Sequence, residues 1–174
     1  EHSRELTHAI MTHPKLALIL ATGGTGLVKA AYSSGNPAIG VGPGNVPVFI
    51  DKSADIPFAV SSVISSKTFD NGTICASEQS IVAEKKISGK VMAEFKKQGG
   101  YFLSPEEVKK LEKVAIDPSS GGMNAAIVGK PARYIADLAG IMLPGNVNLM
   151  LVPLNGIGKD YPLSGEILAP ILSY

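Results

Sequence analysis

Three consecutive stretches, Leu16-Ala-Leu-Ile-Leu-Ala21, Thr22-Gly-Gly-Thr-Gly26 and Leu27-Val-Lys-Ala-Ala-Tyr32, indicate the class of fold. They predict, in this order, a strand, a turn and a helix. The first run is short and continuously apolar, as expected of a parallel strand covered on both faces. The glycine turn then leads into a helix, whose unpaired N–H groups and dipole suit a phosphate. A glycine turn between strand and helix is more often only a turn, so the pattern alone is weak evidence for a phosphate site.

Strand-like and helix-like runs alternate along the rest of the chain. Short apolar runs predict buried strands, and longer runs with apolar residues three or four positions apart predict helices. Such alternation is typical of a parallel sheet with helices on both faces. We therefore predict a three-layer α/β/α fold with a mainly parallel sheet. Strands are expected within 16–21, 37–50, 80–83, 148–152 and 171–174, and helices at 2–12, 27–32, 55–69, 85–98, 104–115 and 131–138.

The predicted helices carry apolar stripes and clear end signals. Asp55 caps the helix over 55–69, and Ser104-Pro-Glu-Glu107 is a capping box with proline at the first helical position. Gly99-Gly100 ends the helix over 85–98, whose lysines indicate a solvated face. The expected core residues are Ile56, Ala59, Val60, Val63 and Ile64 in the first helix, Ile87, Val91 and Phe95 in the next, Val108, Leu111 and Ala115 in the third, and Ile135 and Leu138 in the last.

Composition excludes several classes of protein. The 174 residues carry sixteen basic and fifteen acidic side chains, a net charge of +1, so no strong field attracts nucleic acid or an anionic membrane. Glycine, proline or threonine interrupts every apolar run before it could span a bilayer. We therefore expect neither nucleic acid nor membrane as a partner.

Cysteine and histidine content limits the chemistry further. A single cysteine excludes an intrachain disulfide, which favours a reducing compartment, so we predict a cytoplasmic location. His2, His8 and His13 lie near the start without a second cysteine or a carboxylate cluster, and we predict no metal site. The chain opens without methionine in a helix-like run and stops in a strand-like run. We expect it to be a fragment of a longer protein.

The only cysteine lies in Lys67-Thr-Phe-Asp-Asn-Gly-Thr-Ile-Cys75-Ala-Ser-Glu-Gln79. This segment joins a predicted helix to a predicted strand, so Cys75 should lie on a turn. Asn71-Gly72 is a strong turn signal, and a chain that bends there can direct consecutive backbone N–H groups at one point, as an oxyanion site requires. On composition alone, a lone cysteine is more often an inert small hydrophobe.

Asn-Gly-x-x-Cys followed by Ala-Ser-Glu-Gln resembles the catalytic-cysteine segment of the CoA-acylating aldehyde dehydrogenases, which belong to the aldehyde dehydrogenase superfamily. The resemblance extends from about His13 to Pro170. It implies that Cys75 forms a thioester while a short-chain aldehyde is oxidised to acyl-CoA, or the reverse, with NAD or NADP as cofactor and coenzyme A as co-substrate. It also implies that residues 1–40 end the cofactor-binding domain, and that 41–174 form a catalytic domain truncated at its C-terminal end. We expect a homo-oligomer at full length and an inactive fragment.

The resemblance also assigns cofactor contacts. Gly23 and Gly24 match a Thr-Gly-Gly element that lies against the cofactor pyrophosphate in the family. Gly42 belongs to a turn with glycines at 40, 42 and 44, where the backbone can approach a ligand closely, although a simple connector is an equal reading. Glu166 fits Glu-x-hydrophobic-small-Pro, whose carboxylate binds the nicotinamide-side ribose. Without the resemblance, Glu166 would be read as a solvent-facing loop residue.

Three other functions remain open at this point. A hydrolytic aldehyde dehydrogenase needs a glutamate that activates water, and alignment on Pro47 places Val41 at that position. A phosphorylating relative would share the thioester and release an acyl phosphate. A degenerate, non-enzymatic scaffold domain would be indicated by a buried and unreactive Cys75.

Overall fold

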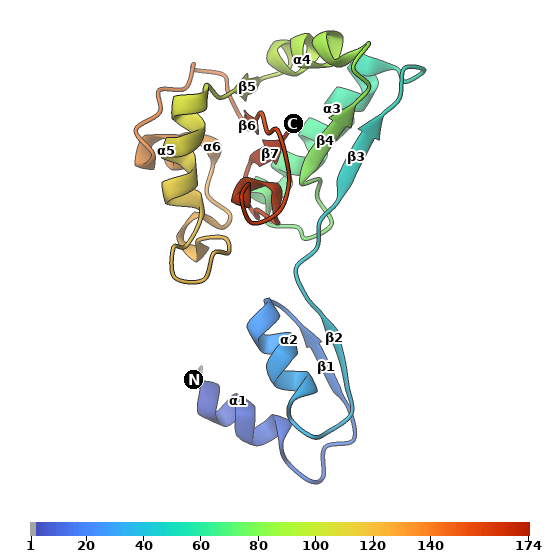
Figure 1. The fold of residues 1–174 in the computed structure, drawn as a ribbon, viewed down its shortest axis with the longest axis vertical. Helices are drawn as coiled ribbons and strands as arrows, with labels where there is room; N and C mark the ends of the chain where they lie inside the picture. Colours follow the sequence, from blue (N-terminus) through green and yellow to red (C-terminus); the bar gives the residue numbers. More distant parts are fainter. Residues whose placement is uncertain (1–2) are drawn as a thin grey trace. The chain divides into compact units, whose positions relative to one another are not determined.

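The computed structural model describes residues 3–174 and divides the chain after Gly44 into two compact units (Figure 1). Unit 1 comprises the described residues up to Gly44, and unit 2 comprises Asn45–Tyr174. The division falls a few residues beyond the boundary expected at 40. That the two units are the end of a cofactor-binding domain and a catalytic domain stays a prediction.

Unit 1 is a strand–helix–strand motif preceded by a helix. Its elements are α1 (Arg4–Met11), β1 (Ile19–Thr22), α2 (Thr25–Tyr32) and β2 (Ala38–Val41). The two strands are parallel, with Ile19 opposite Ala38 and Thr22 opposite Val41, and α2 forms the connection between them (Figure 1). The strand, glycine turn and helix predicted from the sequence are therefore confirmed.

The expectation that β1 is covered on both faces is wrong for the described part of the chain. Ile19 and Ala21 are buried against Ala31 of α2, whereas Leu20, between them, is 74% exposed. Ile39 of β2 is exposed in the same way. Side chains alternate between the faces of a strand, and the helices of unit 1 cover only one face of this two-stranded sheet.

Unit 2 is built on a five-stranded parallel sheet in the order β3-β4-β7-β6-β5. Its strands are β3 (Pro47–Ile50), β4 (Ser80–Ala83), β5 (Gly100–Phe102), β6 (Leu149–Val152) and β7 (Ile171–Ser173). The helices are α3 (Ile56–Thr68), α4 (Ser88–Lys97), α5 (Pro105–Ala115) and α6 (Ala132–Leu138), with short 3-10 turns η1 (Phe69–Gly72), η2 (Ala125–Ile127) and η3 (Pro162–Ser164).

Two buried clusters, one on each face of the sheet, confirm the three-layer prediction. In β6, Leu149 and Leu151 pack in the cluster that contains α3 and α4, whereas Met150 and Val152 pack in the cluster that contains α5 and α6. Figure 1 shows α5 and α6 on one side of the strands and α3 on the other. Helices on both faces explain why every residue of β6 is buried.

The helix ends follow the predicted caps. The Asp55 carboxylate accepts a hydrogen bond from the N–H of Phe58, and Ser104 and Glu107 form both bonds of the capping box. The predicted stripe of α4 is buried, whereas Leu138 of α6 is 54% exposed, so its expected core position is wrong. Ala136 takes the core position beside Ile135 instead.

Strand β5 was not expected, because Gly99-Gly100 looks like a helix terminator alone. Gly100 is the first residue of the strand, and a Cβ there would lie 2.6 Å from Leu151 Cδ1 and 2.9 Å from the carbonyl oxygen of Phe95. Glycine is thus the residue that lets β5 approach both its neighbouring strand and α4.

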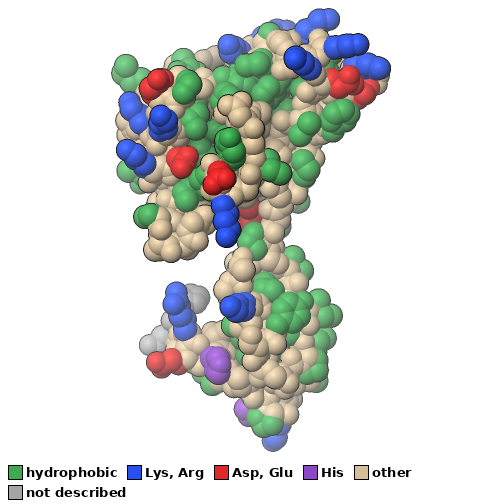
Figure 2. All heavy atoms as spheres, in the orientation of Figure 1, with side chains coloured by type: hydrophobic (Ala, Val, Ile, Leu, Met, Phe, Trp, Pro, Cys, Tyr) green, Lys and Arg blue, Asp and Glu red, His purple; other side chains and the backbone are tan. Residues whose placement is uncertain are grey.

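The surface around α4 carries the lysines that the sequence places on a solvated face. Lysines gather over α4 in Figure 2, and Lys85, Lys86 and Lys90 are exposed, as expected of a solvated face. Among the described residues, no helix combines the length and the apolar character needed to cross a bilayer.

Candidate active site

Cys75 lies on a turn between η1 and β4, as predicted. The N–H of Ser77 donates to the carbonyl oxygen of Ile74 at 2.9 Å, which places Cys75 and Ala76 at the centre of the turn. The Cys75 thiol is free and exposed. A small molecule can therefore reach the sulfur, and the burial that would have favoured a scaffold domain is not observed.

The chain reaches this turn through three consecutive residues in left-handed conformation. Asp70, Asn71 and Gly72 have φ values of 46°, 52° and 75°. The Thr73 hydroxyl stabilises the bend by donating to the Asp70 carboxylate at 2.6 Å. Left-handed conformation costs a residue with a side chain roughly 1–3 kcal/mol, and it is concentrated at functional sites. The Asn71-Gly72 turn signal therefore marks a sharp reversal immediately before Cys75.

Glu166 lies on a loop that is held along its length. Before Glu166, the Asn45 side-chain amide donates to the carbonyl oxygen of Ser164 at 2.9 Å. After it, the carbonyl oxygen of Leu168 accepts a hydrogen bond from the N–H of Gly129 at 3.2 Å. Glu166 itself is half-buried. A carboxylate on a fixed loop suits a directional contact with ligand hydroxyls.

Lys67 is a fully buried charged residue between these two segments. Its Nζ donates to the carbonyl oxygen of Ile167 at 2.9 Å and to Oε1 of Gln79 at 3.1 Å. The same Gln79 oxygen accepts a hydrogen bond from the N–H of Ile167 at 3.0 Å. Burial lowers the pKa of Lys67 to about 8, and the negative charges of Glu78 and Glu166 oppose that change. We call Lys67, Gln79 and the backbone of Ile167 the buried Lys67 network.

Our reading of the sequence missed Lys67, although a signal was present. The apolar stripe of α3 passes through Val60 and Ile64, and Lys67 continues it at helical spacing. A lysine in register with an apolar stripe is either at the end of the stripe or buried with a partner. Its partner Ile167 is too distant in sequence for the pattern to show which applies.

Gly23 and Gly42 directly follow the carboxyl ends of β1 and β2, and Gly24 is the N-cap residue of α2. The N–H of Gly23 donates to the carbonyl oxygen of Val41 at 3.1 Å. No side-chain cap satisfies the first N–H groups of α2, and no atom lies within 4 Å of a Cβ placed on Gly24 or Gly42. Open space beside unpaired N–H groups at a helix start fits a phosphate or pyrophosphate group.

Gly40, in contrast, is needed for packing. A Cβ at this position would lie 2.6 Å from Val28 Cγ1 and 2.9 Å from Tyr32 Cε2, both on α2. The N–H of Gly40 also donates to the Tyr32 hydroxyl at 2.9 Å. Of the glycines at 40, 42 and 44, the first therefore serves contact between strand and helix instead of approach to a ligand.

The predicted site residues belong to two different units. Gly23, Gly24 and Gly42 lie in unit 1, and Cys75 and Glu166 lie in unit 2. Within unit 2 the structure connects the segments of Cys75 and Glu166 through the buried Lys67 network.

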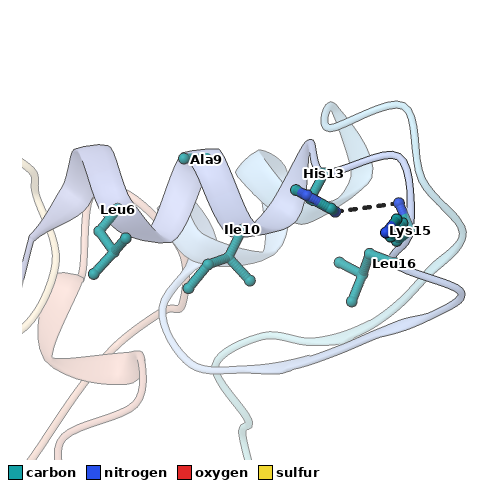
Figure 3. A pocket seen from close by; sticks show the side chains of 6 residues that line it. All are labelled: Leu6, Ala9, Ile10, His13, Lys15 and Leu16. Atoms are coloured by element: carbon teal, nitrogen blue, oxygen red, sulfur yellow. Dashed lines mark hydrogen bonds between the residues drawn. The ribbon is translucent and has the colours of Figure 1, made fainter.

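The histidines form no metal site among the residues that the structure describes, where no group of three or more His, Cys, Asp or Glu side chains could hold an ion. His8 is exposed, and Nδ1 of His13 accepts a hydrogen bond from the N–H of Lys15 at 3.2 Å (Figure 3). His2 lies outside the described residues. The hollow beside His13, about 380 Å³ in volume, is lined mainly by aliphatic side chains and presents no convergent polar groups.

Comparison with known proteins identifies the class. The family model described as "Aldehyde dehydrogenase family" matches residues 1–100, which is more than half of the chain. The chain therefore belongs to the aldehyde dehydrogenase family.

Individual relatives narrow the likeness. The chain is 51% identical over 171 residues to the bifunctional aldehyde-alcohol dehydrogenase AdhE of Escherichia coli (strain K12), covering 98% of this chain and 19% of that protein. It is also 51% identical to an acetylating aldehyde dehydrogenase from Geobacillus thermoglucosidasius, with a TM-score of 0.92, covering 99% of this chain and 38% of that one. A propionaldehyde dehydrogenase from Rhodopseudomonas palustris, solved with bound CoA and an acylated cysteine, is 31% identical with a TM-score of 0.83, covering 98% and 38%.

These proteins are much longer than the chain described here, which spans about a fifth of the curated relative and under two fifths of the solved structures.

Proposed function

We propose that the protein, at its full natural length, oxidises a short-chain aldehyde to acyl-CoA, and catalyses the reverse reaction, through a thioester on Cys75. The observation that carries the proposal is the exposed thiol on the strained turn after Gly72. The solved relative with an acylated cysteine and bound CoA supports it, because that protein belongs to the same fold at 31% identity.

The chemistry begins with attack of the Cys75 thiolate on the aldehyde carbon. A carbon–sulfur bond forms, the carbonyl electrons move to oxygen, and the N–H of Cys75 stabilises the resulting oxyanion. Bound NAD or NADP supplies the hydride acceptor, so that a thioester remains on the cysteine. The thiolate of coenzyme A then attacks the thioester carbon, and Cys75 leaves as a thiolate. In the reverse direction acyl-CoA is reduced to the aldehyde.

The cofactor contacts belong to the same proposal. Gly23 and Gly24 lie against the pyrophosphate, and the backbone at Gly42 approaches the cofactor closely. The Glu166 carboxylate accepts hydrogen bonds from the hydroxyls of the nicotinamide-side ribose. Open space beside Gly24 and Gly42 and the start of α2, which has no side-chain cap, support the glycine assignments. The half-buried position of Glu166 on a held loop supports the ribose contact.

Val41 favours coenzyme A over water as the acceptor. A water-using relative needs a carboxylate as general base, which contributes roughly 10²- to 10⁴-fold to the rate. Val41 is an exposed aliphatic residue and cannot accept a proton. Coenzyme A needs less assistance, because a thiol is partly ionised near neutrality and is intrinsically more nucleophilic than water.

Product analysis tests the proposal. The full-length protein is incubated with a short-chain aldehyde and NAD or NADP, with and without coenzyme A, and with phosphate in place of coenzyme A. We expect acyl-CoA only with coenzyme A, and none from Cys75→Ser. Carboxylate formed at full rate without coenzyme A would favour the hydrolytic alternative, acyl phosphate would favour the phosphorylating one, and no turnover at all would favour a scaffold.

We further propose that the protein acts in the cytoplasm as a homo-oligomer, with a small aldehyde and coenzyme A as its partners and without nucleic acid or a membrane. The near-zero net charge and the single cysteine support this setting. Cell fractionation and light scattering of the purified protein test location and assembly separately. Recovery in the membrane fraction, or a monomer at micromolar concentration, would contradict the respective part.

A further inference from the structure

We propose that Lys67 is a positioning residue, which holds the Cys75 turn and the Glu166 loop in fixed register by hydrogen bonding, with Gln79, to the backbone of Ile167. The inference rests on the proposed function, because it assigns Cys75 and Glu166 to one reaction. It adds a residue that touches neither the substrate nor the cofactor.

The contacts meet at one residue. Lys67 precedes Cys75 on α3 and Gln79 follows it, so both ends of the cysteine segment bond to Ile167, the residue after Glu166. Lys67 bonds to the carbonyl oxygen of Ile167 and Gln79 bonds to its N–H. With both polar groups held, the backbone at Ile167 cannot rotate without breaking a buried hydrogen bond, which is costly.

Gln79 is itself held by the sheet. Its N–H donates to the carbonyl oxygen of Val46, and its own carbonyl oxygen accepts hydrogen bonds from both the N–H and the hydroxyl of Ser173. The side-chain oxygen that Lys67 and Ile167 share is therefore attached to a backbone that joins β4 to β7. A fixed acceptor of this kind can transmit position, whereas a mobile one could not.

The same two segments also meet at Gly72. A Cβ at Gly72 would lie 2.7 Å from the carbonyl oxygen of Ala169 and 3.0 Å from that of Lys67. The cysteine segment thus has two contacts with residues 167–169, one polar and one of close backbone approach. A shift of the Glu166 loop would displace the Cys75 turn with it.

A purely structural explanation of Lys67 is less satisfactory. A methionine would fill the same space without bringing an amine into the interior, and replacing buried charges by apolar residues is often neutral or stabilising. What methionine cannot supply is two directed hydrogen bonds from one point. The geometry of Lys67 is therefore better explained by placement of Ile167 than by stability.

The principal test compares Lys67→Met with Leu111→Ala in the full-length protein. Leu111 is fully buried in the cluster that also contains the Ile167 side chain, so its truncation loosens the packing around the network without removing any of its hydrogen bonds. We expect Lys67→Met to lower kcat by about tenfold and to raise KM for NAD or NADP by about fivefold, because a displacement near 1 Å can cost 10²-fold. Alkylation of Cys75 by iodoacetamide should stay within about twofold of wild type, since the thiol remains exposed.

Two further measurements keep the proposal testable if Lys67→Met folds poorly. Gln79→Leu removes the shared acceptor and should change kcat and KM in the same direction, and the double variant should be less than additive. Hydrogen exchange should show loss of protection at the Ile167 amide in either variant, with or without catalysis.

Specific outcomes would overturn the inference. They are unchanged kcat and KM in Lys67→Met, effects no larger than those of Leu111→Ala, or an Ile167 amide as protected as in wild type. If the wild-type protein forms no acyl-CoA, the proposed function fails, whereas loss of Ile167 protection in Lys67→Met would still support the positioning contact itself.

Discussion

Gly72 lies so close to Ala169 that a Cβ on the glycine would be 2.7 Å from the Ala169 carbonyl oxygen. The same glycine has a φ of 75°, a conformation that residues with side chains rarely adopt. Steric space and backbone conformation therefore both require glycine here, immediately before the cysteine turn.

Gly72→Ala should accordingly destabilise the protein by at least about 2 kcal/mol, since strain and overlap add. Gly89→Ala is a matched control, because Gly89 lies on α4 with no atom within 4 Å of a Cβ, and alanine is the better helix former. The measurement is the midpoint of urea unfolding for both variants. Equal midpoints would show that the turn relaxes around alanine.

Lys67 makes stability depend on pH in the alkaline range. Its pKa falls from an ordinary value of 10.5 to about 8 on folding. Between these values folded Lys67 is neutral and unfolded Lys67 is charged, so unfolding takes up a proton and stability rises with pH, by up to about 1.4 kcal/mol per pH unit. Below about pH 8 Lys67 is charged in both states, so the gain in stability is absent and the free energy of unfolding no longer changes with pH through this residue.

The comparison of wild type with Lys67→Met isolates the effect, because all other groups that titrate there are shared. The difference in free energy of unfolding should move in favour of wild type between pH 8 and 10 and stay constant between pH 6 and 7. A difference that stays constant over the whole range would show that Lys67 keeps its proton in the folded protein.

Val41→Glu should raise thioester hydrolysis at the expense of transfer to coenzyme A, because the new carboxylate can activate water. Ile39→Glu is the control, since Ile39 lies two residues away on β2 and is exposed to the same degree, 58% against 57%. Carboxylate and acyl-CoA are quantified for both variants in the full-length protein. Equal product ratios would remove Val41 from the explanation of acceptor choice.

Glu166→Gln keeps the shape of the side chain and removes its charge. We expect cofactor affinity to fall by about tenfold, as for one charge-assisted hydrogen bond, while the rate of Cys75 alkylation is unchanged. Calorimetric titration with NAD and NADP gives the affinity. An unaltered Kd for NAD and NADP would show that Glu166 does not bind the cofactor and is a solvent-facing loop residue.

The sequence was sufficient to predict an element where the residues that determine it are neighbours in the chain. Strand β4 and the capping box at Ser104 and Glu107 were predicted at their observed positions, because the deciding residues are neighbours. The turn at Cys75 was predictable for the same reason, from the Asn71-Gly72 pair.

Sequence was insufficient where burial depends on a distant segment. Leu20 and Ile19 look equally apolar, yet only one faces a helix. Lys67 looks like a surface lysine until Ile167, far along the chain, supplies its acceptor. Gly100 resembles a terminator because its partner Leu151 belongs to another strand. Each miss concerns a contact between elements, which periodicity within one element does not encode.

The strand order of unit 2 has a consequence for how the site is assembled during synthesis. Strand β7 lies between β4 and β6, although it follows both in the sequence, and it meets β4 at a single pair, Ser80 with Ser173. The parts of the sheet on either side cannot join until β7 has emerged from the ribosome. Because pairings between distant segments form slowly, the Cys75 turn acquires its final geometry late, well after the cysteine itself is made. A nascent chain that stalls before Ile167 would carry an exposed thiol on a turn that lacks the contacts of the Glu166 loop.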